Sequence, residues 1–260
     1  MTLGIDIPSL EQILAAVVFV GMRMAGVMTF APFFGSDGIP RPVKAGFTVL
    51  LTALLYPVSG VTGLALDVVG WVRVAAQEAV IGLLLGLALQ FIFEAAQVAG
   101  QVAGIQAGFS LVTILDPQTQ ADTPVLSIFH QLIVLLIFLR LEVHHWLLRA
   151  LAASFAYLPP GTLLQGPGLA RVLLHAAGTV WLVGVEMAAP VIAATLLADI
   201  ALGFLGKASP QLPVVFVGLS IKSMLGLMVL GGSLALWPRL LEKHFRSALL
   251  VGERLLHLAG

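Results

Sequence analysis

The sequence contains no cysteine and few charged residues. Lysine, arginine, aspartate and glutamate make up 10% of its 260 residues, against roughly 25% in a typical soluble domain. The absence of cysteine excludes disulfides and thiolate metal sites. Hydrophobic residues reach 59%, and the mean hydropathy is +1.05. This composition predicts an integral membrane protein.

Several functional signatures are also missing. Thirteen basic residues balance thirteen acidic ones, which removes the electrostatic case for binding nucleic acid. The sequence has no glycine-rich phosphate-binding loop and no pair of histidines at the spacing of a helical zinc site. Ser110 invites comparison with an intramembrane serine protease, but Leu111 stands where such proteases carry a small residue. We therefore expect no enzyme, no cofactor and no metal.

The remaining sequence predicts an all-α, multi-pass membrane protein. Asp6 and Glu11 lie where a cleavable signal peptide would carry basic residues, so we expect no such signal peptide. About six apolar helical segments follow, at residues 10–34, 43–64, 71–109, 124–151, 170–205 and 211–237. Residues 43–64 form the clearest transmembrane prediction, because no charge lies between Ala45 and Leu66.

The last two apolar segments are predicted to form a helical hairpin. The chain after Pro238 is predicted to form an amphipathic helix that lies at the membrane surface or against a partner. The distribution of lysine and arginine between the loops favours a cytoplasmic C-terminus. The prolines and glycines of residues 158–168 mark a structural boundary.

Polar residues are concentrated in residues 97–124, which contain five glutamines, two aspartates, three threonines and three glycines. At 100° per residue, one face of the helix leading into this stretch is polar and small. We define this polar helix face as Gln90, Glu94, Gln97, Gln101, Gly100 and Gly104. It is either a close helix–helix interface or the lining of an aqueous conduit. The helix containing it is either one long bent helix or two.

Six ionisable residues interrupt the apolar segments: Arg23, Glu78, Glu94, Glu186, Asp199 and Lys222. Each would cost about 2.5–3.5 kcal/mol at the centre of a lipid-exposed helix. The charges therefore face a protein interior, or the helices do not lie in lipid as independent spans. They form structural ion pairs or, in a proton-coupled transporter, relays. The sequence leaves their pairing open.

Several ordered motifs together resemble the FliR family of type III secretion export-gate proteins. They include Pro32, Gly35, Pro40, His144, Pro190, Pro210 and Gln211, and the run of glutamine and glycine at residues 97–110. The sequence departs from the family pattern at Val143, Lys207 and Pro213. These departures concern the geometry of turns.

The resemblance implies a subunit of the flagellar protein-export gate in the bacterial inner membrane, with an injectisome-type gate as the alternative. Such a subunit joins FliP and FliQ in a channel for unfolded flagellar proteins, with FlhB around the entrance and the basal-body ring outside. It also implies a FliP-like region at residues 1–160 and, at residues 161–260, a FliQ-like hairpin followed by the amphipathic helix.

By the same resemblance, residues from about 108 to 122 form a plug loop that closes the channel. Its expected members are Gly108, Phe109, Ser110, Leu111, Val112, Thr113, Ile114, Leu115 and Asp116. The apolar side chains would form a stopper against ion leakage. Gly104 and Gly108 would act as its hinge.

Overall fold

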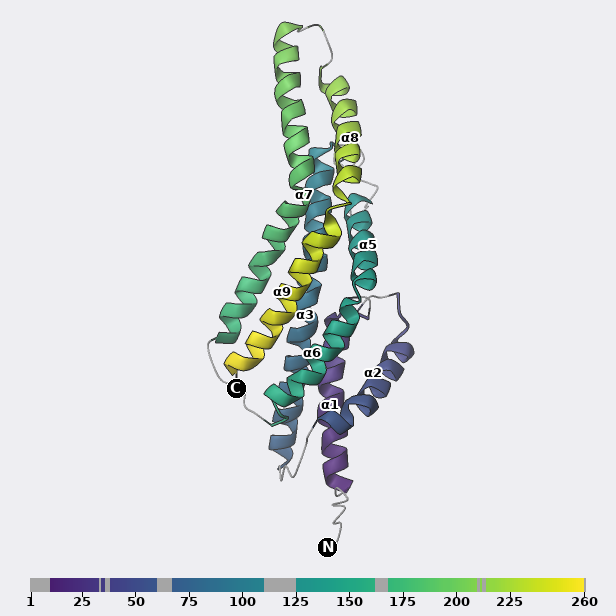
Figure 1. Cartoon of the computed structure of the whole chain (residues 1–260), viewed down its shortest axis with the longest axis vertical. Helices are drawn as coiled ribbons and strands as arrows, with labels where there is room; N and C mark the ends of the chain where they lie inside the picture. The colour runs from purple at the N-terminus through teal and green to yellow at the C-terminus, as the bar shows by residue number, and fades with distance from the viewer. Residues whose placement is uncertain are drawn as a thin grey trace. The chain divides into compact units, whose positions relative to one another are not determined.

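A computed structural model describes residues 10–32, 34–35, 38–59, 67–109, 125–161, 168–209, 211 and 214–259. Every regular element in this part of the chain is helical, which confirms the all-α prediction (Figure 1). The helices are α1 (Leu10–Phe30), α2 (Arg41–Leu55), the short 3-10 helix η1 (Tyr56–Val58), α3 (Val68–Gln106), α5 (Val125–Arg140), α6 (Val143–Tyr157), α7 (Gly168–Ala208), α8 (Val214–Ser233) and α9 (Trp237–Ala259).

Four helices in the described residues are long and apolar enough to cross a membrane. The spans are Ile13–Phe30, Val68–Gln106, Ala176–Ala208 and Phe216–Ser233. A fifth is possible if α5 and α6, which are separated by a sharp bend, act as one broken span. The chain is therefore a multi-pass, all-helical membrane protein.

The prediction that residues 43–64 form the clearest span is wrong. Helix α2 contains 15 residues and ends at Leu55, so it is about 22 Å long and falls short of the roughly 30 Å hydrocarbon core. Pro57 explains the early end, because proline has no N–H for the helical ladder and its ring crowds the carbonyl of the residue four positions earlier. The apolar run continues beyond it, but the helix becomes the short η1.

The structure also settles the bounds of the helices in the third and fourth apolar segments. The third apolar segment is one helix, since α3 runs without a break for 39 residues. The fourth segment is divided into α5 and α6 at Leu141 and Glu142, and Glu142 has the left-handed backbone angle φ of 55°. Helix α6 ends at Tyr157 and α7 begins at Gly168, so residues 158–167 lie between two helices. That this stretch divides the chain into two regions stays a prediction.

The chain divides into two compact units. Unit 1 comprises residues 1–90, 142–176 and 246–260, and unit 2 comprises residues 91–141 and 177–245. In unit 1, Phe19 of α1 packs on Trp71 of α3 with ring centroids 5.0 Å apart. The backbones of α1 and α3 also come close, because a Cβ at Gly26 or Gly82 would collide with backbone atoms of the other helix.

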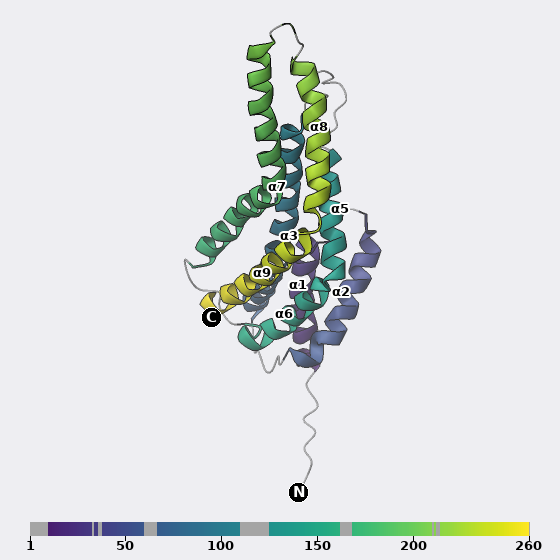
Figure 2. The same cartoon turned by 45° about the horizontal axis from the view of Figure 1, so that its top comes forward.

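In unit 2, the rings of Phe93, Phe138 and Phe245 pack together with centroids 5.7–6.3 Å apart. Within this unit α7 and α8 lie side by side in both views (Figures 1 and 2). Lys222 Nζ of α8 donates to Asp199 Oδ2 of α7 at 2.8 Å. The predicted helical hairpin is thus confirmed.

Helix α9 has the amphipathic pattern expected after Pro238. Leu241, Phe245 and Leu249 recur every four residues and are buried, whereas Lys243 and Arg246 are exposed.

Candidate functional site

A fully buried arginine links three elements of unit 1. Arg23 of α1 donates from Nε to Glu78 Oε2 of α3 at 2.6 Å. Its Nη1 donates to Ser154 Oγ of α6, and its Nη2 to the carbonyl oxygen of Leu158, both at 2.8 Å. The guanidinium also lies 4.1 Å from the centroid of the Phe155 ring, within cation–π distance. We call this group the Arg23 clamp.

Two hydrogen-bond acceptors of the Arg23 clamp, Ser154 and Leu158, lie at the C-terminal end of α6. Ser154 donates its hydroxyl proton to the carbonyl oxygen of Leu151 at 2.6 Å, so its hydroxyl oxygen is oriented to accept from Arg23. The carbonyl of Leu158 lies just past the end of α6, where helix carbonyls lack an intrahelical partner. The clamp therefore caps α6 as well as neutralising Glu78.

Most of the charges in the apolar segments have a close partner. Beyond the Arg23–Glu78 pair, Asp199 pairs with Lys222 at 2.8 Å, and His244 Nε2 lies 3.0 Å from Glu186 Oε2. The latter two contacts lie in unit 2. These three contacts give Arg23, Glu78, Asp199, Lys222 and Glu186 each a partner within 3.0 Å, which favours structural pairing over a relay.

The polar helix face packs against α5 at its centre. Ser127 Oγ donates to the carbonyl oxygen of Gln97 at 3.1 Å, and Gln131 Nε2 donates to Gln97 Oε1 at 3.3 Å. A Cβ at Gly100 would lie 2.7 Å from the carbonyl oxygen of Leu126 and still closer to Cα of Ser127. Here the face forms a close helix–helix interface.

The rest of the polar helix face is less tightly enclosed. A Cβ at Gly104 would lie 3.8 Å from the nearest atom of Leu126, an ordinary contact. Gln90, Glu94 and Gln101 are half-buried. Whether any of these side chains lines a conduit stays a prediction.

Helix α3 ends in a glycine motif at the start of the predicted plug loop. Phe109 N–H donates to Gly104 O at 2.9 Å, and Gly108 N–H to Ile105 O at 3.1 Å, while Gly108 has φ of 84°. These paired bonds around a left-handed glycine form a Schellman cap. Ser223 of α8 donates to the carbonyl oxygen of Ala107 at 2.7 Å, which fixes the cap to the hairpin.

Phe109 is exposed. The other expected plug residues lie outside the described residues: Ser110, Leu111, Val112, Thr113, Ile114, Leu115 and Asp116. The plug assignment stays a prediction.

The residues of the family motif do not converge on one site. Pro32 and Gly35 lie in the turn after α1, where Gly35 N–H donates to Ala31 O at 2.7 Å. Pro40 precedes α2 as its N-cap residue. The remainder are spread over later elements: His144 in α6, Pro190 inside α7 and the exposed Gln211 after α7, with Pro210 outside the described residues. Their placement indicates roles in turns and helix geometry.

Sequence reasoning missed the partners of Arg23 and a buried histidine. His130 of α5 is fully buried, its Nδ1 lies 2.7 Å from the carbonyl oxygen of Leu126, and its ring packs on Trp237 at 4.9 Å. The only available signal for His130 was its position in an apolar run. No group of three or more potential metal ligands occurs among the residues with described positions.

Together the fold and these contacts define a helical membrane protein whose polar groups serve mainly helix packing. The chain matches the family model of bacterial export proteins, family 1, over residues 14–248. It is 32% identical to the flagellar biosynthetic protein FliR of Pectobacterium carotovorum subsp. carotovorum, over 86% of each chain.

Similar matches come from distant bacteria. The FliR protein of Bacillus subtilis is 30% identical over 85% of this chain and 87% of its own, and that of Aquifex aeolicus is 27% identical over 94% of each. The chain therefore belongs to the FliR family of bacterial export proteins, as its motifs indicated.

Proposed function

We propose that the chain is a subunit of the flagellar type III protein-export gate in the bacterial inner membrane. With FliP and FliQ it forms the channel through which unfolded flagellar proteins leave the cytoplasm. Membership of the FliR family supports this proposal, and the names of the relatives favour the flagellar over the injectisome type of gate. We assign the chain no catalytic residue.

The exposed apolar surface of α7 carries the argument for assembly. Large exposed apolar side chains recur along the part of α7 in unit 2, from Trp181 to Leu205. The chain itself leaves these side chains uncovered, and in the proposed gate neighbouring protein subunits cover them.

The expected partners fit the two parts of the chain. The α7–α8 hairpin would be the FliQ-like element of residues 161–260, and the helices up to α6 the FliP-like region of residues 1–160. FlhB would surround the entrance, and the basal-body ring would enclose the assembly. A self-contained proton-coupled transporter is less well supported, because the charges in the apolar segments form close pairs such as Arg23–Glu78 and Lys222–Asp199.

Deleting the gene is expected to abolish secretion of the flagellar filament protein and motility, and the plasmid-borne chain should restore both. Immunoblotting of culture supernatants and swimming assays measure this result. An isogenic deletion of a late filament gene serves as the control, because it removes motility while export of earlier flagellar proteins continues. Normal secretion in the gene deletion would contradict the proposed function.

Deleting Leu111 to Leu115 is expected to raise ion leakage through the gate several-fold without preventing its assembly, because the apolar stopper is lost. Replacing Leu111, Ile114 and Leu115 by serine should have the same effect at unchanged loop length. Conductance of the purified complex in planar bilayers measures both. Thr113→Ser is the control and should leave conductance unchanged. Wild-type conductance in both altered loops would exclude the plug assignment.

A further inference from the structure

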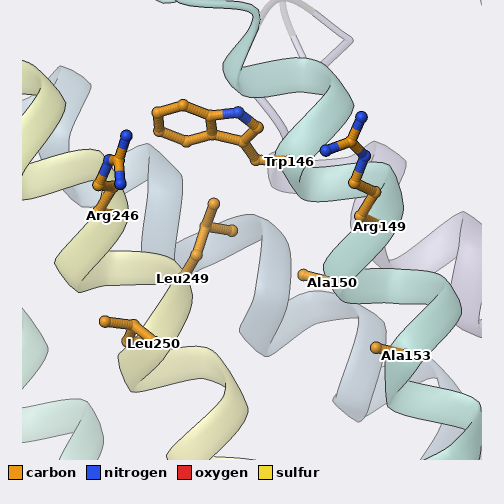
Figure 3. Close-up of a pocket in the computed structure, with 7 residues that line it drawn as sticks. All are labelled: Trp146, Arg149, Ala150, Ala153, Arg246, Leu249 and Leu250. Carbon is orange, nitrogen blue, oxygen red and sulfur yellow. The ribbon is translucent and has the colours of Figure 1, made fainter.

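A pocket between α6 and α9 in unit 1 combines two arginines with an apolar floor (Figure 3). Its volume is about 470 Å³, within the range of roughly 300–1,000 Å³ for small-molecule sites. It is lined by Trp146, Arg149, Ala150 and Ala153 of α6 and by Arg246, Leu249 and Leu250 of α9. Neither the family motif nor the proposed export role accounts for it.

The lining residues follow the periodicity of the two helices. Positions 146, 149, 150 and 153 form one stripe of α6, and positions 246, 249 and 250 form one stripe of α9. The guanidinium of Arg246 lies 5.1 Å from the centroid of the Trp146 ring, within cation–π distance. Figure 3 shows the indole between the two arginines. The pocket is thus formed by two continuous helix faces that lie side by side.

The charge of the pocket selects an anion. Two guanidinium groups line it, and none of the lining residues that the structure describes carries a carboxylate. Arginine presents a planar set of donors that matches a phosphate group. Arg149 and Arg246 are both exposed, so a phosphate can contact the two guanidinium groups without displacing buried side chains.

The floor of the pocket selects an apolar tail. Ala150, Ala153, Leu249 and Leu250 offer a phosphate no hydrogen bond, so a free phosphate would leave this surface in contact with water. An anionic phospholipid has a phosphate for the two arginines and an acyl chain for the apolar residues. Basic pockets between membrane helices bind such head groups, and tryptophan prefers the membrane interface where head groups lie.

We propose that this pocket binds an anionic phospholipid, with its phosphate between Arg149 and Arg246 and an acyl chain along Ala150, Ala153 and Leu250. The ring of Trp146 holds Arg246 in position for this contact. The proposal does not rest on the export role and would stand for any membrane function of the chain.

Native mass spectrometry of the full chain in detergent, titrated with phosphatidylglycerol or phosphatidylcholine, tests the proposal. Phosphatidylglycerol should bind more tightly than the zwitterionic lipid. Arg149→Gln combined with Arg246→Gln should weaken its binding about 30-fold, at about a factor of five for each cation removed. The matched control combines Arg140→Gln with Arg239→Gln, two exposed arginines outside the pocket, and should change binding less than twofold.

A second variant tests the floor independently of charge. Ala153→Phe fills the space for the acyl chain and should weaken phosphatidylglycerol binding while both arginines remain. Size-exclusion chromatography and circular dichroism establish that each variant is folded. Equal affinity for the two lipids, or equal losses in the pocket and control pairs, would overturn the proposal. Displacement of the lipid by millimolar inorganic phosphate or by an acidic peptide would also overturn it, in favour of a soluble anion or a protein segment.

Discussion

Arg23→Ala is expected to destabilise the protein by about 3–5 kcal/mol, because it leaves Glu78 as an uncompensated buried charge. Arg23 is fully buried and joins α1 to α3 and to the end of α6. Removing it breaks three hydrogen bonds at once. At about 2–4 °C per kcal/mol for a chain of this size, the unfolding midpoint in detergent should fall by about 10 °C.

The double variant Arg23→Met, Glu78→Leu tests whether the two charges serve structure or function. Replacing a buried ion pair by apolar residues of similar volume is often close to neutral. The double variant should therefore recover most of the stability lost in Arg23→Ala, although the Leu158 carbonyl stays without its donor. Lys222→Ala is the control, because its partner Asp199 is half-exposed, and such pairs contribute about 0–1 kcal/mol. A double variant as unstable as Arg23→Ala would contradict this account of the clamp.

Gly100→Ala and Gly104→Ala are expected to change stability in opposite directions. Within a helix, alanine is favoured over glycine by roughly 0.5–1 kcal/mol. Gly104 has room for a methyl group, whose nearest neighbour would be a side-chain atom of Leu126 at 3.8 Å, so the variant should gain stability. At Gly100 the methyl group would meet backbone atoms of Leu126 and Ser127. Helix α5 would have to move, at about 1–3 kcal/mol for an overpacked site.

Thermal unfolding in detergent measures both glycine variants, and Gly46→Ala serves as the control because a methyl group there would have no atom within 4 Å. A rise in the midpoint for Gly104→Ala and a fall for Gly100→Ala would establish the polar helix face as a packing surface. Equal midpoints for the two variants would show that α3 and α5 do not approach as closely as described. Because Gly104 is also the expected hinge of the plug loop, its variant should be assayed for secretion as well.

Strong local signals in the sequence predicted much of the fold. Two apolar segments joined by a short connection predicted the hairpin of α7 and α8, and amphipathic periodicity predicted α9. The spacing of Gln97 and Gly100 predicted a polar, small helix face, which the structure packs on α5. In each case the residues that carry the signal lie within a few turns of one another, so helical geometry alone relates them.

The failures have physical causes as well. Residues 43–64 were predicted as a span because of their length and lack of charge, and the prediction did not consider Pro57, near which α2 gives way to η1. The partners of Arg23 come from positions 55 and 131 residues away, and no local rule connects them. The arginine pocket was missed for the same reason, since Arg149 and Arg246 meet only when α6 packs on α9.

The native mass of the complex purified from membranes through this chain tests the central claim most directly. The account predicts one copy of the chain together with several copies of FliP-like and FliQ-like subunits, which in the proposed gate cover the exposed apolar surface of α7. A monomer or a homo-oligomer that stays folded without such subunits, obtained from cells that make flagella, would contradict it.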